Sequence, residues 1–173
     1  EGKRMTIAAP ESMSGGNVLS VSQLQVGFRS RAGLVNVVRD MSFQVARGEI
    51  FAVIGESGSG KSTIANAAMG LLPANAEIEG IVELNGMSIY EMTARARRRL
   101  CGERIALISQ DALTGLNPCT TVGYQIAETL MVHRGEIKAT AMARAVELLT
   151  VTGIPSARER ANDYPHQFSG GMR

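Results

Sequence analysis

Nine consecutive residues combine glycines, hydroxyl groups and a lysine at a spacing suited to binding phosphate. In order, they are Gly55, Glu56, Ser57, Gly58, Ser59, Gly60, Lys61, Ser62 and Thr63. They fit the pattern G-x-x-x-x-G-K-[ST] of a phosphate-binding loop. Glycines let successive backbone N–H groups turn toward a phosphate, Lys61 would reach the β- and γ-phosphates, and Ser62 would place its hydroxyl oxygen on Mg²⁺. The segment predicts a nucleoside triphosphate site.

Such a loop needs a strand before it and a helix after it. The apolar run at residues 50–54 predicts a buried strand that leads into the loop, and residues 64–72 predict the helix whose dipole adds positive potential. Residues 104–109 predict a second buried strand beside the first. The alternative is a Gly-Ser surface loop, which does not account for this flanking pattern.

The other expected elements form a small sheet and a helical region. Apolar residues predict strands at 18–28, 35–45 and 78–84, the last closing on the hairpin-type turn Asn85-Gly86. Helices are predicted at 122–133 and 137–151, and Gly153 and Pro155 end the second. Its stripe of Ile137, Ala141, Ala145, Leu148 and Leu149 indicates core packing.

Composition is that of an ordinary globular domain. The chain has 173 residues, 45% hydrophobic and 20% charged, so it can bury a core without metals or disulfides. A net charge of +2 argues against a nucleic-acid-binding protein. Cys101 and Cys119 lack metal-ligand spacing and are expected to be structural thiols of a reduced, cytosolic protein.

The beginning of the chain differs from the rest. Residues 1–17 are rich in Gly, Ser, Ala and Pro without periodicity, which predicts a disordered tail or an expression remnant. Residues 18–173 then form one expected domain. No stretch reaches the roughly 20 apolar residues that cross a bilayer, so the chain is not expected to span a membrane by itself.

A second phosphate-binding pattern lies near the other end of the chain. In the sequence YPHQFSGGMR (residues 164–173), Ser169 could cap a helix whose first N–H groups are left bare by Gly170 and Gly171. Two separate phosphate cradles in one chain are expected only if they serve different nucleotides or different copies of the protein.

The two motifs, with Gln110 at the end of a predicted strand, resemble the ATP-binding subunit of an ABC transporter. The resemblance covers essentially all of residues 18–173. It implies that Gln110 contacts Mg²⁺ and the attacking water and links the nucleotide to membrane subunits. It also implies that Phe28 stacks on adenine with Val38 nearby. The remaining implied site residues contact the γ-phosphate of ATP held by the opposite subunit; they are Ser169, Gly170 and Gly171.

The details are similar to one branch of that family, the importers of dipeptides, oligopeptides and nickel. The matching segments are SQDALTGLNP (109–118), TVG (121–123) and YPH (164–166) with GGMR (170–173). Met172 takes the place of a glutamine common in other branches. Ala112 departs from the branch, which usually carries proline there, so the backbone of the Gln110 loop is expected to be less rigid.

The resemblance implies an architecture, cofactors and partners. The fold is expected to be α/β: a P-loop NTPase core, an antiparallel β subdomain and a helical subdomain at about 120–165, with the C-terminal part of the core missing. ATP and Mg²⁺ are the implied cofactors. The implied partners are a second ATP-binding subunit, two integral membrane permease subunits and, indirectly, an extracytoplasmic solute-binding protein. The implied location is peripheral, on the cytoplasmic side of the inner membrane.

Part of the family's catalytic set has no counterpart in these residues. Family members carry an apolar strand ending in Asp-Glu and then a histidine near the γ-phosphate, and neither His133 nor His166 matches it. The chain alone is therefore expected to bind nucleotide weakly and not to hydrolyse it. Three functions stay open: a transport ATPase subunit, a non-hydrolytic nucleotide-binding fragment, and an ABC ATPase without a membrane partner.

A basic cluster lies between the two motifs. Arg95, Arg97, Arg98 and Arg99, with Arg104 behind them, fall on a predicted short helix. A solvated face is the simpler interpretation, and contact with a membrane subunit or with lipid headgroups is the alternative.

Overall fold

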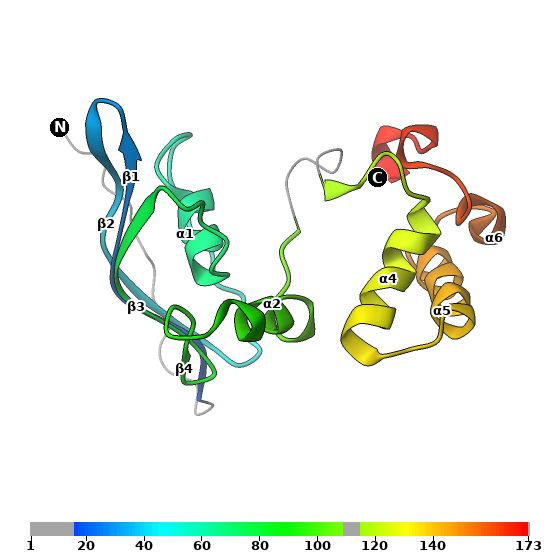
Figure 1. Cartoon of the computed structure of the whole chain (residues 1–173), viewed down its shortest axis with the longest axis horizontal. Coiled ribbons are helices and arrows are strands. Elements are labelled where there is room, and N and C mark those ends of the chain that lie inside the picture. The colour runs from blue at the N-terminus through cyan, green and yellow to red at the C-terminus, as the bar shows by residue number, and fades with distance from the viewer. Residues whose placement is uncertain (1–15, 109–114, 173) are drawn as a thin grey trace. The chain divides into compact units, whose positions relative to one another are not determined.

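The computed structural model describes residues 16–108 and 115–172. The chain forms two compact units, residues 1–98 and residues 99–173. The first unit holds a sheet and one helix, and the second is helical (Figure 1). The predicted tail lies almost wholly outside the described residues, and the first strand begins at Asn17.

The sheet of the first unit is antiparallel and four-stranded, in the order β2-β1-β3-β4. Its strands are β1 Asn17–Ser30, β2 Gly33–Ala46, β3 Ala76–Leu84 and β4 Met87–Ser88. Asn85 and Gly86 join the last two strands with φ of 50° and 75°. Positive φ at both central residues is what a tight type I′ hairpin requires, so the predicted turn is confirmed.

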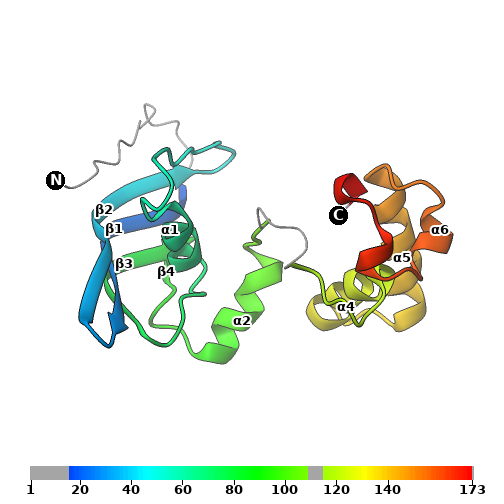
Figure 2. The ribbon, with the colours of Figure 1, turned by 90° about the horizontal axis from the view of Figure 1, so that it is seen from above.

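Helix α1, Lys61–Ala68, lies against one face of this sheet in both ribbon views (Figures 1 and 2). Ile64 is 2% exposed and joins the buried strand residues. Those are Val21, Leu24, Val26 and Val82, with Ile89 after β4. The helix stops earlier than predicted because Gly70 takes φ +65° and the chain turns, with Leu71 N–H donating to Asn66 O at 2.9 Å.

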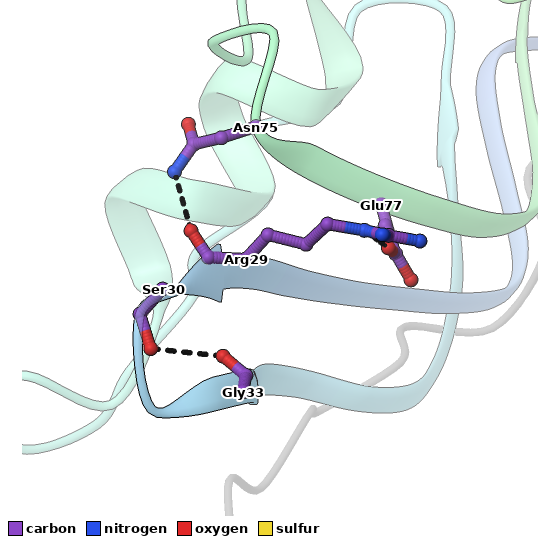
Figure 3. A network of polar contacts seen from close by, with 5 residues as sticks. All are labelled: Arg29, Ser30, Gly33, Asn75 and Glu77. Atoms are coloured by element: carbon purple, nitrogen blue, oxygen red, sulfur yellow. Dashed lines mark hydrogen bonds and ion pairs between the residues drawn. The ribbon is translucent and has the colours of Figure 1, made fainter.

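A polar network closes the end of the sheet where β1 turns into β2 (Figure 3). Arg29 N–H donates to Asn75 O at 2.9 Å, and Asn75 Nδ2 donates back to Arg29 O at 3.2 Å. The Arg29 guanidinium pairs with Glu77 of β3. Ser30 Oγ donates to Gly33 O at 2.8 Å across the turn. These bonds fix the backbone on the C-terminal side of Phe28.

Two predicted strands are not formed. Residues 50–54 have no strand structure, and in the second segment a single bridge, from Ile105 to Cys101, is the pairing present among residues 104–108. Ile50 and Ile108 are each 96% exposed. The prediction of two buried strands is wrong for this chain, because a strand needs a neighbour to satisfy its backbone N–H and C=O groups. Among the described residues, neither segment has such a neighbour.

The second unit is built on two packed helices, α4 Val122–Arg134 and α5 Lys138–Val151, which lie side by side in Figure 1. It also contains α6 Ala157–Arg160 and the 3-10 turns η1 Pro165–Gln167 and η2 Gly170–Met172. Helix α2, Ala94–Glu103, runs across the boundary between the units and loses helical geometry at Cys101 and Gly102.

The core of the helical unit follows the predicted stripe, with one exception. Ala141, Ala145 and Leu149 of α5 are buried, and Ala127 of α4 packs against the two alanines. Ile137, expected on the same stripe, instead precedes the helix and is 71% exposed. No helix among the described residues is long and apolar enough to cross a membrane.

Candidate nucleotide-binding site

The lysine of the phosphate-binding loop is held by the loop itself. Lys61 Nζ donates to Gly55 O at 2.8 Å and to Glu56 O at 2.7 Å. The ammonium group therefore lies over the start of the loop, within the ring of residues that the motif assigns to phosphate. An anion there could replace these two carbonyl acceptors with charged oxygens, so that both partners of each hydrogen bond carry charge.

Gly60 seats the loop on the sheet. It takes φ +94° as the cap of α1, and its backbone accepts the first helical bond, from Ile64 N–H at 3.0 Å. A Cβ at this position would lie 3.2 Å from Val37 O and 3.4 Å from Val38 Cγ2. The loop thus packs directly against β2 at Gly60, where there is no side chain. The backbone N–H groups at the N-terminus of α1 are then available to bind an anion.

The other outer glycine makes room for a hydroxyl. A Cβ on Gly55 would lie 2.7 Å from Ser59 Oγ. That hydroxyl is buried and, among the described residues, has no hydrogen-bond partner. A buried polar atom without a partner is unfavourable and is commonly matched by a ligand or ion. The Ser59 hydroxyl and the Lys61 ammonium group are both donors that could bind an anion in the loop.

The residues also fit Mg²⁺ delivered with a nucleotide. Ser62 is exposed on the first turn of α1, where its hydroxyl oxygen could join a metal shell. Among the described residues, no group of three or more His, Cys, Asp or Glu could hold a metal by itself. Mg²⁺ would thus be held by Ser62 together with phosphate oxygens.

Tyr90 holds the far end of the helix that follows the loop. Its hydroxyl donates to Ala67 O at 2.7 Å, which satisfies a carbonyl of the last turn of α1. Burial raises the pKa of Tyr90 to about 12, with an opposing effect from the nearby Arg97 guanidinium. The phenol therefore stays a hydrogen-bond donor throughout the physiological range. Tyr90 could not be singled out from the sequence, because no motif marks a tyrosine whose hydroxyl binds the end of a helix distant in the chain.

The structure places the two predicted adenine-side residues on neighbouring strands. Phe28 is half-buried in β1, opposite Val35 of β2 and Ala76 of β3. Val38 is 4% exposed in β2, beneath Gly60. Gln110 lies outside the described residues, so its role stays a prediction.

The second motif is an exposed turn held by buried neighbours. Ser169, Gly170 and Gly171 are exposed, and a Cβ on either glycine would meet no atom within 4 Å. Phe168, just before them, is 3% exposed and belongs to a core cluster against which Met172 also packs. Met172 N–H donates to Ser169 O at 3.0 Å and closes the turn. The helical unit thus exposes a glycine-rich backbone segment with open space beside it, which a ligand could occupy.

The remaining histidines and thiols have local contacts. The His133 ring lies against Gly102, and His166 stacks on Tyr164 with ring centroids 5.8 Å apart. Cys101 and Cys119 form no disulfide.

Comparison with known proteins decides the family. Residues 38–173 match the ABC transporter family. The chain belongs to this family.

Relatives of this ABC protein include named transport subunits. The dipeptide transport ATP-binding protein DppD of Lactococcus lactis subsp. cremoris is 45% identical over 158 residues, which are 90% of this chain and 45% of that protein. The oligopeptide transport ATP-binding protein OppD of Salmonella typhimurium is 44% identical over 156 residues, 90% of this chain and 47% of that protein. The chain spans about half the length of the curated relatives it matches.

Solved ABC cassettes have the same fold. The dimeric structure of MJ0796, a bacterial ABC transporter cassette, matches with a TM-score of 0.76 at 22% identity, over 89% of this chain and 64% of that chain. A post-hydrolysis state of the MJ0796 cassette, bound to ADP and Pi, matches with a TM-score of 0.74 at 21% identity, over the same shares of the two chains. The predicted ABC ATPase fold class is confirmed, although two of its expected strands are not formed in this chain.

Proposed function

We propose that this chain is the nucleotide-binding part of an ABC importer subunit that couples ATP binding and hydrolysis to uptake of peptides or a related small solute, nickel included. The single observation that carries the proposal is the loop in which Lys61 Nζ and the buried Ser59 hydroxyl, which has no hydrogen-bond partner among the described residues, both lie against Gly55. Identity of 41–45% to the DppD and OppD transport subunits supports the importer branch.

The loop residues divide the work on the triphosphate. Backbone N–H groups of the loop and of the first turn of α1 would surround the β-phosphate, and Lys61 would neutralise charge on the β- and γ-phosphates. Ser62 would hold Mg²⁺, which supplies charge neutralisation when bound. Gln110 would orient the attacking water for in-line displacement, where positioning and electrostatics supply nearly all the catalysis.

The second motif would complete the site of another subunit. Ser169, Gly170 and Gly171 are exposed and present backbone N–H groups with no side chain over the two glycines. In the proposed assembly they contact the γ-phosphate of ATP held by a partner's loop. A second ATP-binding subunit, two permease subunits at the cytoplasmic face of the inner membrane and, indirectly, an extracytoplasmic solute-binding protein complete the transporter.

Turnover needs a general base or polarising carboxylate that these residues do not supply. The 173 residues contain no Asp-Glu pair after an apolar strand. We therefore expect the chain alone to bind nucleotide without steady hydrolysis. Phosphate release by the purified chain that is abolished by Lys61→Ala would contradict this part of the proposal.

The test is purification, from membranes of its host, of the tagged transport subunit that contains these residues, followed by peptide-dependent ATP hydrolysis and uptake in vesicles. Lys61→Ala should abolish both activities, whereas Lys138→Ala, an exposed lysine beside the Tyr124 ring, should retain them. Recovery without any integral membrane partner would favour an ABC ATPase that acts outside transport.

A further inference from the structure

The first turn of α4 is attached to the chain that precedes it through one side chain, Gln125. The Gln125 side-chain oxygen accepts from Asn117 N–H at 2.8 Å, and Gln125 Nε2 donates to Asn117 O at 3.0 Å and to Thr120 O at 2.8 Å. One amide thus pairs with both backbone groups of a single residue, as a neighbouring strand would. A primary amide can make this two-way contact, and shorter or charged side chains cannot reproduce it in full.

The attached segment, residues 117–120, has a fixed shape of its own. Asn117 Oδ1 accepts from Cys119 N–H at 2.9 Å, which is an Asx turn around Pro118. Thr120 N–H donates to Asn117 O at 3.3 Å. Gln125 therefore holds a preformed turn, and this turn follows closely in sequence on Gln110.

The same helical turn is attached to a second segment on its other side. Val122 N–H donates to Asp163 O and Gly123 N–H donates to Ala161 O, both at 2.9 Å. Helix N-termini carry N–H groups without intrahelical partners, and the side chain of Thr121 makes no capping bond here. The backbone of residues 161–163 thus caps α4.

Gly123 allows this close approach. A Cβ on Gly123 would lie 2.5 Å from Ala161 O and 2.8 Å from Ala161 Cβ. Its φ is not positive, so the glycine is required by contact and not by backbone conformation. Any side chain would push residues 161–163 away from α4.

The capping segment leads directly into the exposed motif. Pro165 and Phe168 are buried, and Tyr164 N–H donates to the Gln167 side-chain oxygen at 2.7 Å. The Arg160 guanidinium lies 5.9 Å from the centre of the Phe168 ring and pairs with Asp163 at 3.7 Å. Residues 161–168 are therefore a short, internally bonded connection from α4 to Ser169.

We propose that Gln125 and Gly123 are positioning residues that fasten two functional segments, the exit of the Gln110 loop and the approach to Ser169-Gly170-Gly171, to one turn of α4. This rests on the proposed function for the roles of the two segments. A displacement of residues 117–120 then moves the turn of α4, and the turn moves residues 161–168. The hydrogen bonds of Gln125, of the turn at residues 117–120 and of the cap of α4 then couple a change at one of these segments to the other.

Amide hydrogen exchange of the 173-residue chain tests the attachment, with Gln125→Ala as the variant. We expect exchange at Asn117 to rise about tenfold, because its backbone N–H loses the Gln125 acceptor, and exchange at Gly123 and Phe168 to rise at least about threefold. Exchange in the middle of α5, at Ala145, should not change. The matched control is Glu128→Ala, an exposed position one turn later on α4 whose side chain has no hydrogen-bond or ion-pair partner among the described residues. Gln125→Glu keeps the acceptor for Asn117 N–H and should lie between the wild type and Gln125→Ala.

Kinetics of the complete transporter test the positioning. Gln125→Ala should lower kcat for ATP by about tenfold with KM for ATP unchanged, because the Lys61 loop is untouched. Gly123→Ala should have the same or a larger effect, and if it does not fold, the Gln125 variants decide alone. Unchanged exchange at Asn117, or raised exchange there with unchanged exchange at Phe168 and unchanged kcat, overturns the proposal. If the wild-type complex has no ATPase activity, the proposed function fails, and the exchange experiment still decides whether the two segments are fastened together.

Discussion

The two units of this protein each present a segment that is predicted to bind phosphate, and the two segments are supported in different ways. In the helical unit the residues on both sides of the Ser-Gly-Gly turn are anchored, because Phe168 is buried and Met172 packs on the same cluster. In the sheet unit the side after the loop is anchored by Ile64 and Gly60, whereas the side before it contacts the sheet through the stacking of Phe51 on Phe43. The side before it, residues 50–54, has no strand partner among the described residues.

This difference follows from where each unit obtains its hydrogen bonds. The backbone around the Ser-Gly-Gly turn pairs within residues 99–173, through local turns and the cap of α4. A strand before a phosphate-binding loop must instead pair with other strands of its sheet. A helical segment thus satisfies its backbone hydrogen bonds within a short stretch of sequence. A loop at the end of a strand is held in position only when neighbouring strands pair with that strand.

The largest expected effect is at the anchor of the helical unit. Phe168→Ala should lower the free energy of unfolding by about 3–5 kcal/mol, because it removes a buried aromatic ring and leaves a cavity beside Val122, Leu149 and Ala157. Urea denaturation followed by circular dichroism measures it. Tyr164→Ala, at a ring that is 41% exposed, should change the same quantity by less than about 1 kcal/mol. Equal losses for the two variants would mean that the motif is not anchored through Phe168.

The seat of the phosphate-binding loop should be the next most sensitive position. Gly60→Ala combines φ +94° with a Cβ at 3.2 Å from Val37 O, so it should cost about 1–3 kcal/mol and displace the loop from β2. Gly135→Ala is the matched control, since Gly135 also has positive φ, at +67°, but no atom within 4 Å of its Cβ position. A larger loss at Gly135 than at Gly60 would show that backbone strain alone matters and that the seat on β2 does not.

The sequence predicted the antiparallel strands β1, β2 and β3 to within a few residues, but not the absence, among the described residues, of the strands expected at 50–54 and 104–109. Residues 55–63 and 169–171 stand out in the sequence because phosphate binding demands particular residue types in a fixed order, and their roles stay predictions. The turn at Asn85-Gly86 was found because positive φ at both positions selects those residues. The prediction of a strand at 50–54 was wrong for this chain. An apolar run indicates that a segment could be buried, but it does not indicate whether a neighbouring strand is present to pair with it. Gln125 was missed because a glutamine that pairs with the backbone of a preceding turn belongs to no motif with a fixed spacing.

Tyr90 should have a smaller effect, one that depends on pH. Tyr90→Phe removes the hydrogen bond to Ala67 O and should cost about 1 kcal/mol at pH 7. The wild type keeps the Tyr90 proton up to a pKa of about 12, whereas the unfolded chain loses it near 10.0. The free energy of unfolding of the wild type should therefore fall as pH rises from 10 to 12, and this fall should be shallower in Tyr90→Phe. Parallel curves for the two proteins in that range would contradict the assignment.

The smallest effect on stability is expected at the unpaired segment before the loop. Ile54 is 73% exposed, so Ile54→Ser should change the free energy of unfolding by no more than about 0.5 kcal/mol. It should reduce self-association in sedimentation velocity, because exposed apolar segments without strand partners tend to pair with other chains. A loss comparable to that of Gly60→Ala would mean that residues 50–54 are packed in solution and would remove the contrast between the two units.

Equilibrium binding of a fluorescent ATP analogue to the 173-residue chain with Mg²⁺ tests the central claim most directly. Lys61→Ala should weaken binding by about 10- to 150-fold, the effect of losing charge-assisted hydrogen bonds worth about 1.5–3 kcal/mol. At concentrations where the chain is monomeric, Ser169→Ala should leave the affinity unchanged, because that residue acts on the nucleotide of a partner. Binding that is unaffected by Lys61→Ala, or that is lost in Ser169→Ala, would contradict the account of one loop that holds ATP and one turn that completes another subunit's site.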